Sequence, residues 1–137
     1  MNEAGKRRVP DIAAEADAII QSLMYKDHQG KERLDLKTSQ IRKFLAAVTA
    51  VTNQIEVWHM QHIDTDELPD HLAAEIKYLK VKLAYQAGRE RTVKAFAEKA
   101  ELSKRIDSIG RSRAKYQEFA HFVEALVAYH RFHGGQE

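Results

Sequence analysis

The sequence contains no cysteine, which excludes disulfide bonds, zinc sites with thiolate ligands and enzymes with a cysteine nucleophile. A chain of this kind fits a reducing compartment, and we expect a cytoplasmic protein. Long apolar runs are also lacking, since the longest, residues 45–51, already contains a threonine; we therefore expect no helix that crosses a membrane. A glycine-rich phosphate loop and a nucleophile elbow are missing as well. These absences point to a protein without a cofactor and without catalytic activity.

Strand-like alternation of apolar and polar residues is absent too, and apolar residues instead recur at helical spacing. We expect an all-α fold: one compact domain, residues 1–137, built as a bundle of about five helices, with residues 1–9 loose. Thr38 or Ser39 suits the N-cap of the second helix, and the polar stretch 27–35 is typical of a loop. The predicted helices cover residues 10–24, 38–58, 69–88, 90–109 and 112–133.

The third predicted helix has two different faces. One is apolar and typical of burial, and it consists of Leu72, Ile76, Leu79, Leu83 and Ala87. The other combines aromatic, apolar and cationic side chains, namely Tyr78, Val81 and Tyr85 beside Lys77 and Lys82. This second face either packs inside a bundle, with lysine stems over its rim, or lies at the surface, where lysines meet phosphates and tyrosines stack on unpaired bases. Gly88 is expected to end the helix, because glycine tolerates the left-handed conformation found there.

Charge is unevenly distributed along the chain, although the formal net charge is only +2. Residues 56–75 hold six acidic side chains and no Lys or Arg, whereas residues 77–115 hold twelve Lys or Arg and four acidic side chains. Residues 37–55 add three basic side chains and no acidic one. Two basic segments thus flank one acidic connection, and a charge dipole of this kind can steer the approach of partners.

Two Glu-x-x-His motifs, which start at Glu56 and Glu118, have the spacing of a ferritin-like dimetal site, and Glu75 and Glu98 could complete the ligand set. Chance accounts for this spacing in a chain with so many glutamates and histidines. His121 also falls on a polar side of its helix, whereas a dimetal ligand has to point into the core. We therefore expect no metal site.

Three blocks of the sequence resemble a known family when they are taken together. They are residues 36–44 (LKTSQIRKF), residues 78–89 (YLKVKLAYQAGR) and residues 122–135 (FVEALVAYHRFHGG). In this order they resemble the small subunit of the Csm effector complex of type III-A CRISPR systems. Residues 1–35 and the acidic connection 56–69 carry no such resemblance.

The resemblance implies a helical, non-catalytic subunit that stacks in several copies beside the large and backbone Csm subunits. It also implies that the subunit lines the groove where target RNA pairs with guide RNA, and that it contacts phosphates through basic side chains of the matching blocks. These are Lys37, Arg42, Lys43, Lys80, Lys82 and Arg89, to which local charge adds Lys77, Arg91, Arg111 and Arg113. Such contacts follow the backbone, because specificity is delegated to base pairing. The alternative is a structural helical adaptor that binds only protein partners.

Overall fold

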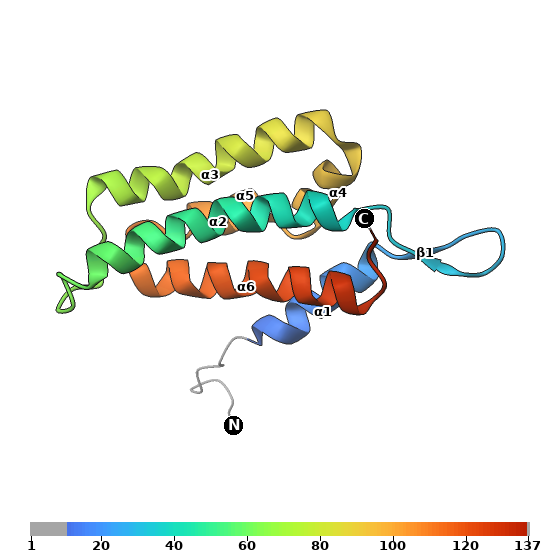
Figure 1. Ribbon diagram of the computed structural model, residues 1–137, viewed down its shortest axis with the longest axis horizontal. Helices are drawn as coiled ribbons and strands as arrows, with labels where there is room; N and C mark the ends of the chain where they lie inside the picture. Colours follow the sequence, from blue (N-terminus) through green and yellow to red (C-terminus); the bar gives the residue numbers. More distant parts are fainter. Residues whose placement is uncertain (1–10, 137) are drawn as a thin grey trace, which may run out of the picture.

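The computed structural model describes residues 11–136, and most of them are helical (Figure 1). The helices are α1 (Ile12–Ser22), α2 (Thr38–His59), α3 (Asp70–Arg89), α4 (Arg91–Lys99), α5 (Leu102–Asp107) and α6 (Arg113–Phe132), and the short strands are β1 (Tyr25–Lys26) and β2 (Glu32–Arg33). The predicted all-α class is confirmed. The expectation that residues 1–9 are loose lies outside the described residues.

Three long helices lie side by side, with α2 between α3 and α6 and antiparallel to both (Figure 1). The remaining helices cover the flanks, because α1 packs against α6, and α4 and α5 pack against α3. None of the helices within residues 11–136 combines the length and the apolar character that crossing a membrane requires.

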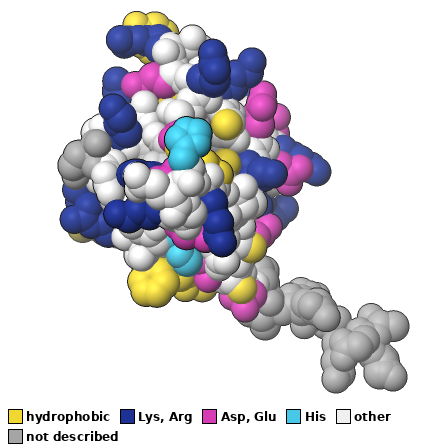
Figure 2. All heavy atoms as spheres, turned by 90° about the vertical axis from the view of Figure 1, so that its right-hand side faces the viewer, with side chains coloured by type: hydrophobic (Ala, Val, Ile, Leu, Met, Phe, Trp, Pro, Cys, Tyr) yellow, Lys and Arg dark blue, Asp and Glu magenta, His cyan; other side chains and the backbone are white. Residues whose placement is uncertain are grey.

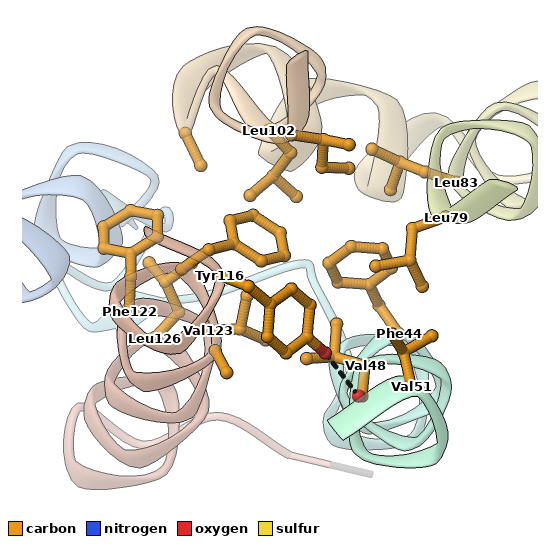
Figure 3. Packing of buried hydrophobic residues seen from close by; sticks show 14 of the residues in the cluster. Phe44, Val48, Val51, Leu79, Leu83, Leu102, Tyr116, Phe122, Val123 and Leu126 are labelled. Atoms are coloured by element: carbon orange, nitrogen blue, oxygen red, sulfur yellow. Dashed lines mark hydrogen bonds between the residues drawn. The ribbon is translucent and has the colours of Figure 1, made fainter. Parts of the chain in front are cut away.

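All six helices contribute apolar side chains to one core. The predicted apolar face of α3 is confirmed, since Leu72, Ile76, Leu79 and Leu83 are at most 3% exposed. Figure 3 shows Leu79 and Leu83 of α3 directed toward the centre of the bundle, where aromatic and aliphatic side chains of α2 and α6 also lie. With one face of α3 held in the core, its opposite face is directed outward.

A buried hydrogen bond joins α6 to α2. The hydroxyl of Tyr116 donates to the backbone carbonyl of Val48 at 2.8 Å (Figure 3) and lies 2.9 Å from Thr52 Oγ1. Burial raises the pKa of Tyr116 to about 12, so this hydroxyl keeps its proton at neutral pH and remains a donor. The bond fixes the axial position of α6 relative to α2.

The expected fourth helix, residues 90–109, is wrong as a single element. It is divided into α4 and α5 at Glu101, whose backbone is left-handed, with φ 54° and ψ 43°. An α-helix of L-residues cannot continue through such a conformation. Residues 11–136 therefore contain six helices rather than the five expected, and α5 can turn so that Leu102 and Ile106 reach the core.

The expected loop at residues 27–35 and the expected absence of strands also need correction. β1 and β2 form an antiparallel hairpin, with Tyr25 opposite Arg33 and Lys26 opposite Glu32. The turn is held by the carboxylate of Asp27, which accepts the N–H groups of residues 29 and 31 and lies 2.8 Å from Nε of Arg33. Strands of two residues are too short to produce a recognisable alternation.

Two predicted helix ends differ from the structure. Gly88 does not end α3, which continues to Arg89, and the extended residue Glu90 makes the turn into α4. Lys37 rather than Thr38 or Ser39 is the N-cap of α2. Thr38 is buried, and its backbone N–H donates to the carbonyl of Gln136 at 2.7 Å. The carboxyl-terminal segment thus satisfies one of the backbone N–H groups that lack a partner within the helix at the start of α2.

Candidate nucleic-acid interface

Polar contacts fix how the beginning of α2 meets the end of α3. The side-chain amide of Gln86 donates to the backbone carbonyl of Gln40 at 2.9 Å, and Thr92 Oγ1 donates to the side-chain oxygen of Gln40 at 2.9 Å. Gln86 is only 6% exposed, and a buried amide without partners would be costly. These contacts bring two distant basic blocks of the sequence, residues 36–44 and 78–89, to one place in the fold.

A hollow lies between the two helices where these blocks meet, and we call it the α2–α3 groove. Its volume is about 460 Å³, and its lining residues are Lys43, Phe44, Ala47, Tyr78, Val81, Lys82, Tyr85 and Gln86. Phe44 and Gln86 are buried and form the floor. Lys43 is an exposed side chain of α2, and Lys82 is an exposed side chain of α3, so cations line the groove from both sides.

The second face of α3 lies at the surface. Tyr78 is 53% exposed, Val81 51% and Tyr85 66%. Of the two interpretations of this face, burial inside the bundle is therefore wrong. Single exposed apolar side chains are common on protein surfaces, but several that lie together usually mark a site where a partner binds.

Each of the two tyrosines has a cation beside its ring. Lys82 Nζ lies 5.9 Å from the ring centroid of Tyr78, and Arg89 Cζ lies 5.7 Å from the ring centroid of Tyr85. Both pairs have i, i+4 spacing, which places their members on the same side of a helix. Arg89 therefore extends the row of cations past the end of the groove.

Not all predicted phosphate contacts belong to this groove. Arg42 is exposed, but it lies about 100° away from Lys43 around α2. Lys37 is exposed at the N-cap of α2, and Arg91 is exposed at the start of α4. Figure 2 views this end of the molecule and shows Lys and Arg side chains spread over much of it, with fewer acidic side chains between them.

Lys77, Lys80 and Arg111 lie on the other side of α3. Lys80 Nζ lies 2.8 Å from a carboxylate oxygen of Asp107, and this hydrogen bond lowers the pKa of the Asp107 carboxyl. Arg111 pairs with the carboxylate of Asp70 and donates to the carbonyl of residue 68 at 3.1 Å. Lys80 and Arg111 are thus already paired within the chain, whereas Lys77 lines a separate hollow beside Tyr78.

Arg113 lies apart from the α2–α3 groove and does not line it. It is half-buried at the start of α6 and lines a small hollow that also contains Glu56 and Tyr116. The ten predicted contacts therefore do not form one continuous surface. The structure brings together Lys43, Lys82 and Arg89.

The acidic connection has a structural role that the sequence did not reveal. The carboxylate of Asp66 accepts the backbone N–H of Ala114 at 2.9 Å and the hydroxyl of Ser112 at 2.9 Å. The carbonyl of Asp66 accepts the backbone N–H of Arg113 at 2.9 Å. An anionic side chain at this position stabilises the N-terminus of α6, because it satisfies free N–H groups and opposes the helix dipole.

The two Glu-x-x-His motifs do not form a ligand set, although Glu56 and His121 line the same small hollow. Glu118 and His121 are both exposed on α6, and Glu98 is exposed on α4. Within residues 11–136, no group of three or more His, Asp or Glu side chains is placed to hold a metal ion.

The ten predicted contacts did not include Tyr78 and Tyr85, which line the groove and which the sequence offered for base stacking only under one of the two interpretations of this face. The signal that could have identified them is a repeat in the sequence of α3, where a tyrosine is followed four residues later by a Lys or Arg, twice, seven residues apart. Gln40 and Gln86, which hold the two blocks together, gave no such signal, because their contact joins residues that are distant in sequence.

A family model and several curated proteins match most of the chain, and all of them carry the same family name. The family model of Csm2 Type III-A matches residues 16–136. A protein of Streptococcus thermophilus named CRISPR system Cms protein Csm2 is 36% identical over 116 residues, which are 85% of this chain and 86% of that protein. Proteins of the same name from Enterococcus italicus and Mycobacterium tuberculosis are each 32% identical, over 79% and 74% of this chain and 78% of each relative.

Proposed function

Because the chain belongs to the Csm2 family of type III-A CRISPR systems, we propose that it binds RNA through the α2–α3 groove without reading the base sequence. The resemblance found in three blocks of the sequence is confirmed by this membership. The chain is therefore a structural subunit of a type III-A effector complex, and its partners include other Csm subunits. The proposal concerns what it contacts inside that complex.

The observation that carries the proposal is the convergence of cations from two sequence blocks. Lys43 of α2 and Lys82 of α3 line the groove, and Arg89 of α3 lies beside the ring of Tyr85, which also lines it. None of them forms an ion pair within residues 11–136. Ammonium and guanidinium groups that are not paired with a carboxylate can bind phosphate oxygens.

Phosphate contacts explain how such a subunit can serve any guide sequence. Every nucleotide presents the same backbone charge, so a row of cations follows the strand regardless of its bases. We propose that both guide RNA and target RNA are partners of this kind. Three contacts give only weak binding by a single chain, but neighbouring copies on one strand would raise the effective concentration.

The opposite end of α2 supports contacts with proteins instead. Val57 is 66% exposed, Met60 is 75% exposed, and Ile63 in the following loop is 70% exposed. Apolar side chains gathered in this way suit a protein surface rather than a phosphate backbone. We therefore assign the contacts with other Csm subunits, or with a neighbouring copy, to this end.

The salt dependence of RNA binding tests the proposal. We expect the logarithm of the affinity to fall linearly with the logarithm of salt concentration, with a slope near 2 in magnitude, since three phosphate contacts contribute about 0.7 each on a single strand. Fluorescence anisotropy with two labelled RNAs of equal length and unrelated sequence should give the same slope for both. Binding to neither RNA would reject the proposal in favour of the adaptor that meets only proteins, and a strong preference for one sequence would reject backbone recognition.

A further inference from the structure

We infer that Tyr78 and Tyr85 stack on unpaired bases, so that the α2–α3 groove takes single-stranded RNA, or bases displaced from a duplex, rather than a continuous duplex. This inference rests on the proposed function and adds the class of ligand. Cations alone would fit any phosphate backbone. The exposed aromatic rings beside the cations add a preference for unpaired bases over a continuous duplex.

The repeat along α3 matches the composition of a nucleotide. Tyr78 with Lys82 forms one unit, and Tyr85 with Arg89 forms the next. Each unit places a cation within 6 Å of an aromatic ring, and a nucleotide offers a matching pair of groups, a phosphate and a flat base that are joined through the ribose. Surfaces that bind single strands combine these two elements, a basic track and aromatic side chains on which bases stack.

The spacing of the two units fits a short stretch of one strand. Seven residues of α-helix advance about 10.5 Å along the axis. A stacked strand advances about 3.4 Å per nucleotide, so the two rings lie about three nucleotides apart. Val81 lies between them at the surface and lines the groove, and it offers an apolar contact to the intervening nucleotides.

A duplex makes poor use of this surface. The faces of paired bases are hidden inside a helix, and proteins recognise double-stranded RNA mostly through its shape, phosphates and 2′-hydroxyls. Two tyrosines that are more than half exposed would then contribute nothing. Unpaired bases, in contrast, can be splayed out and stacked on aromatic rings.

A protein partner fits the same surface less well. Protein interfaces are enriched in tyrosine and arginine, but lysine is depleted there. Lys43, Lys77 and Lys82 all adjoin the tyrosines, either in the α2–α3 groove or in the hollow on the other side of Tyr78. Because three lysines lie beside the two tyrosines, we expect the partner at this surface to carry phosphates rather than to be a protein.

Abasic RNA separates stacking from phosphate binding. The probes are a labelled single-stranded RNA and an RNA of the same length whose central nucleotides lack their bases but retain every phosphate. We expect the full chain to bind the intact RNA roughly tenfold or more tightly than the abasic one. The double variant Tyr78→Leu with Tyr85→Leu should bind the intact and the abasic RNA with equal affinity. The slope of log affinity against log salt concentration should stay as it is in the unchanged protein.

Two further variants control for structure and chemistry. Tyr25→Leu removes another exposed tyrosine, in the hairpin, and should keep the full preference for intact RNA. Tyr78→Phe with Tyr85→Phe keeps both rings without hydroxyls and should also keep it. Equal affinity of the unchanged chain for intact and abasic RNA would overturn stacking and leave the phosphate contacts standing.

Two other outcomes are also decisive. Binding to neither probe would overturn the proposed function itself. If the leucine variant weakens association with other Csm subunits or between copies, yet still prefers intact RNA, the tyrosines contact protein and the inference is overturned.

Discussion

Reversing the charges of Lys43 and Lys82 together, one on each side of the α2–α3 groove, is expected to weaken RNA binding roughly 10- to 100-fold at low salt. Both ammonium groups are exposed and border the same groove. Glutamate at either position removes a phosphate contact and adds repulsion of the backbone. Loss of two contacts on a single strand should also lower the magnitude of the salt slope by about 1.4.

The matched control makes the same change in charge elsewhere. Lys104 on α5 and Lys115 in the first turn of α6 are exposed, and neither lines the groove. Lys104→Glu with Lys115→Glu should therefore bind RNA within about twofold of the unchanged protein once the difference in net charge is screened by salt. Lys80 is unsuitable for this test, because its replacement also breaks the ion pair with Asp107. Equal losses in the two double variants would mean that net charge, and not the groove, governs binding.

Unfolding in urea, followed by circular dichroism, tells whether the double variant is folded. Exposed substitutions of this kind usually change the free energy of unfolding by less than about 0.5 kcal/mol. A loss of RNA binding with unchanged stability assigns Lys43 and Lys82 to the RNA surface. A large loss of stability would mean instead that the two side chains support the fold.

Phe96→Ala is expected to lower the free energy of unfolding by about 3–5 kcal/mol. Phe96 is 1% exposed and comes from α4, a helix of nine residues whose other buried side chain is Val93. Truncation leaves a cavity beneath α3, and the walls of a packed core close such a cavity only in part. The midpoint and slope of urea unfolding give the change directly.

Phe132→Ala is the control for Phe96→Ala, because it removes the same atoms from a position that is 77% exposed. We expect a change of less than about 0.5 kcal/mol there. If the two substitutions had similar effects on the free energy of unfolding, α4 would not be anchored to the core as the structure has it.

The periodic parts of the fold could be predicted from the sequence. The buried face of α3 followed from leucines and an isoleucine at i, i+4, i+7 and i+11. The long helices α2, α3 and α6 lie within a few residues of their predicted limits. Such patterns are local, so one sequence contains them completely. The composition of the second face of α3 was equally visible, but its exposure depended on which helices pack against α3.

Other features depended on conformations or contacts that no local pattern encodes. The division between α4 and α5 results from the left-handed backbone of Glu101, a residue that ordinarily favours helix. Lys80 and Arg111 looked like free cations until the fold placed Asp107 and Asp70 beside them. The list of ten cations therefore included residues whose charges are already paired.

The sequence indicated the cations of the candidate site but not their arrangement in space. Lys43, Lys82 and Arg89 were selected because they lie in two blocks that resemble the family. Their convergence required the antiparallel packing of α2 and α3, which buried glutamine contacts hold in place. Recognition of the family thus pointed to two blocks, and the fold shows which of their cations lie near one another.

Cross-linking of the assembled complex tests most directly whether RNA lies in the α2–α3 groove. The complex is purified from its native host through a tag on this chain, irradiated with ultraviolet light and digested, and nucleotides attached to peptides are located by mass spectrometry. We predict attachment within residues 78–89, at Tyr78 or Tyr85, and its loss in a complex carrying Lys43→Glu and Lys82→Glu. A complex that retains its RNA but shows cross-links of this chain only outside α2 and α3, or none on this chain, would contradict the account.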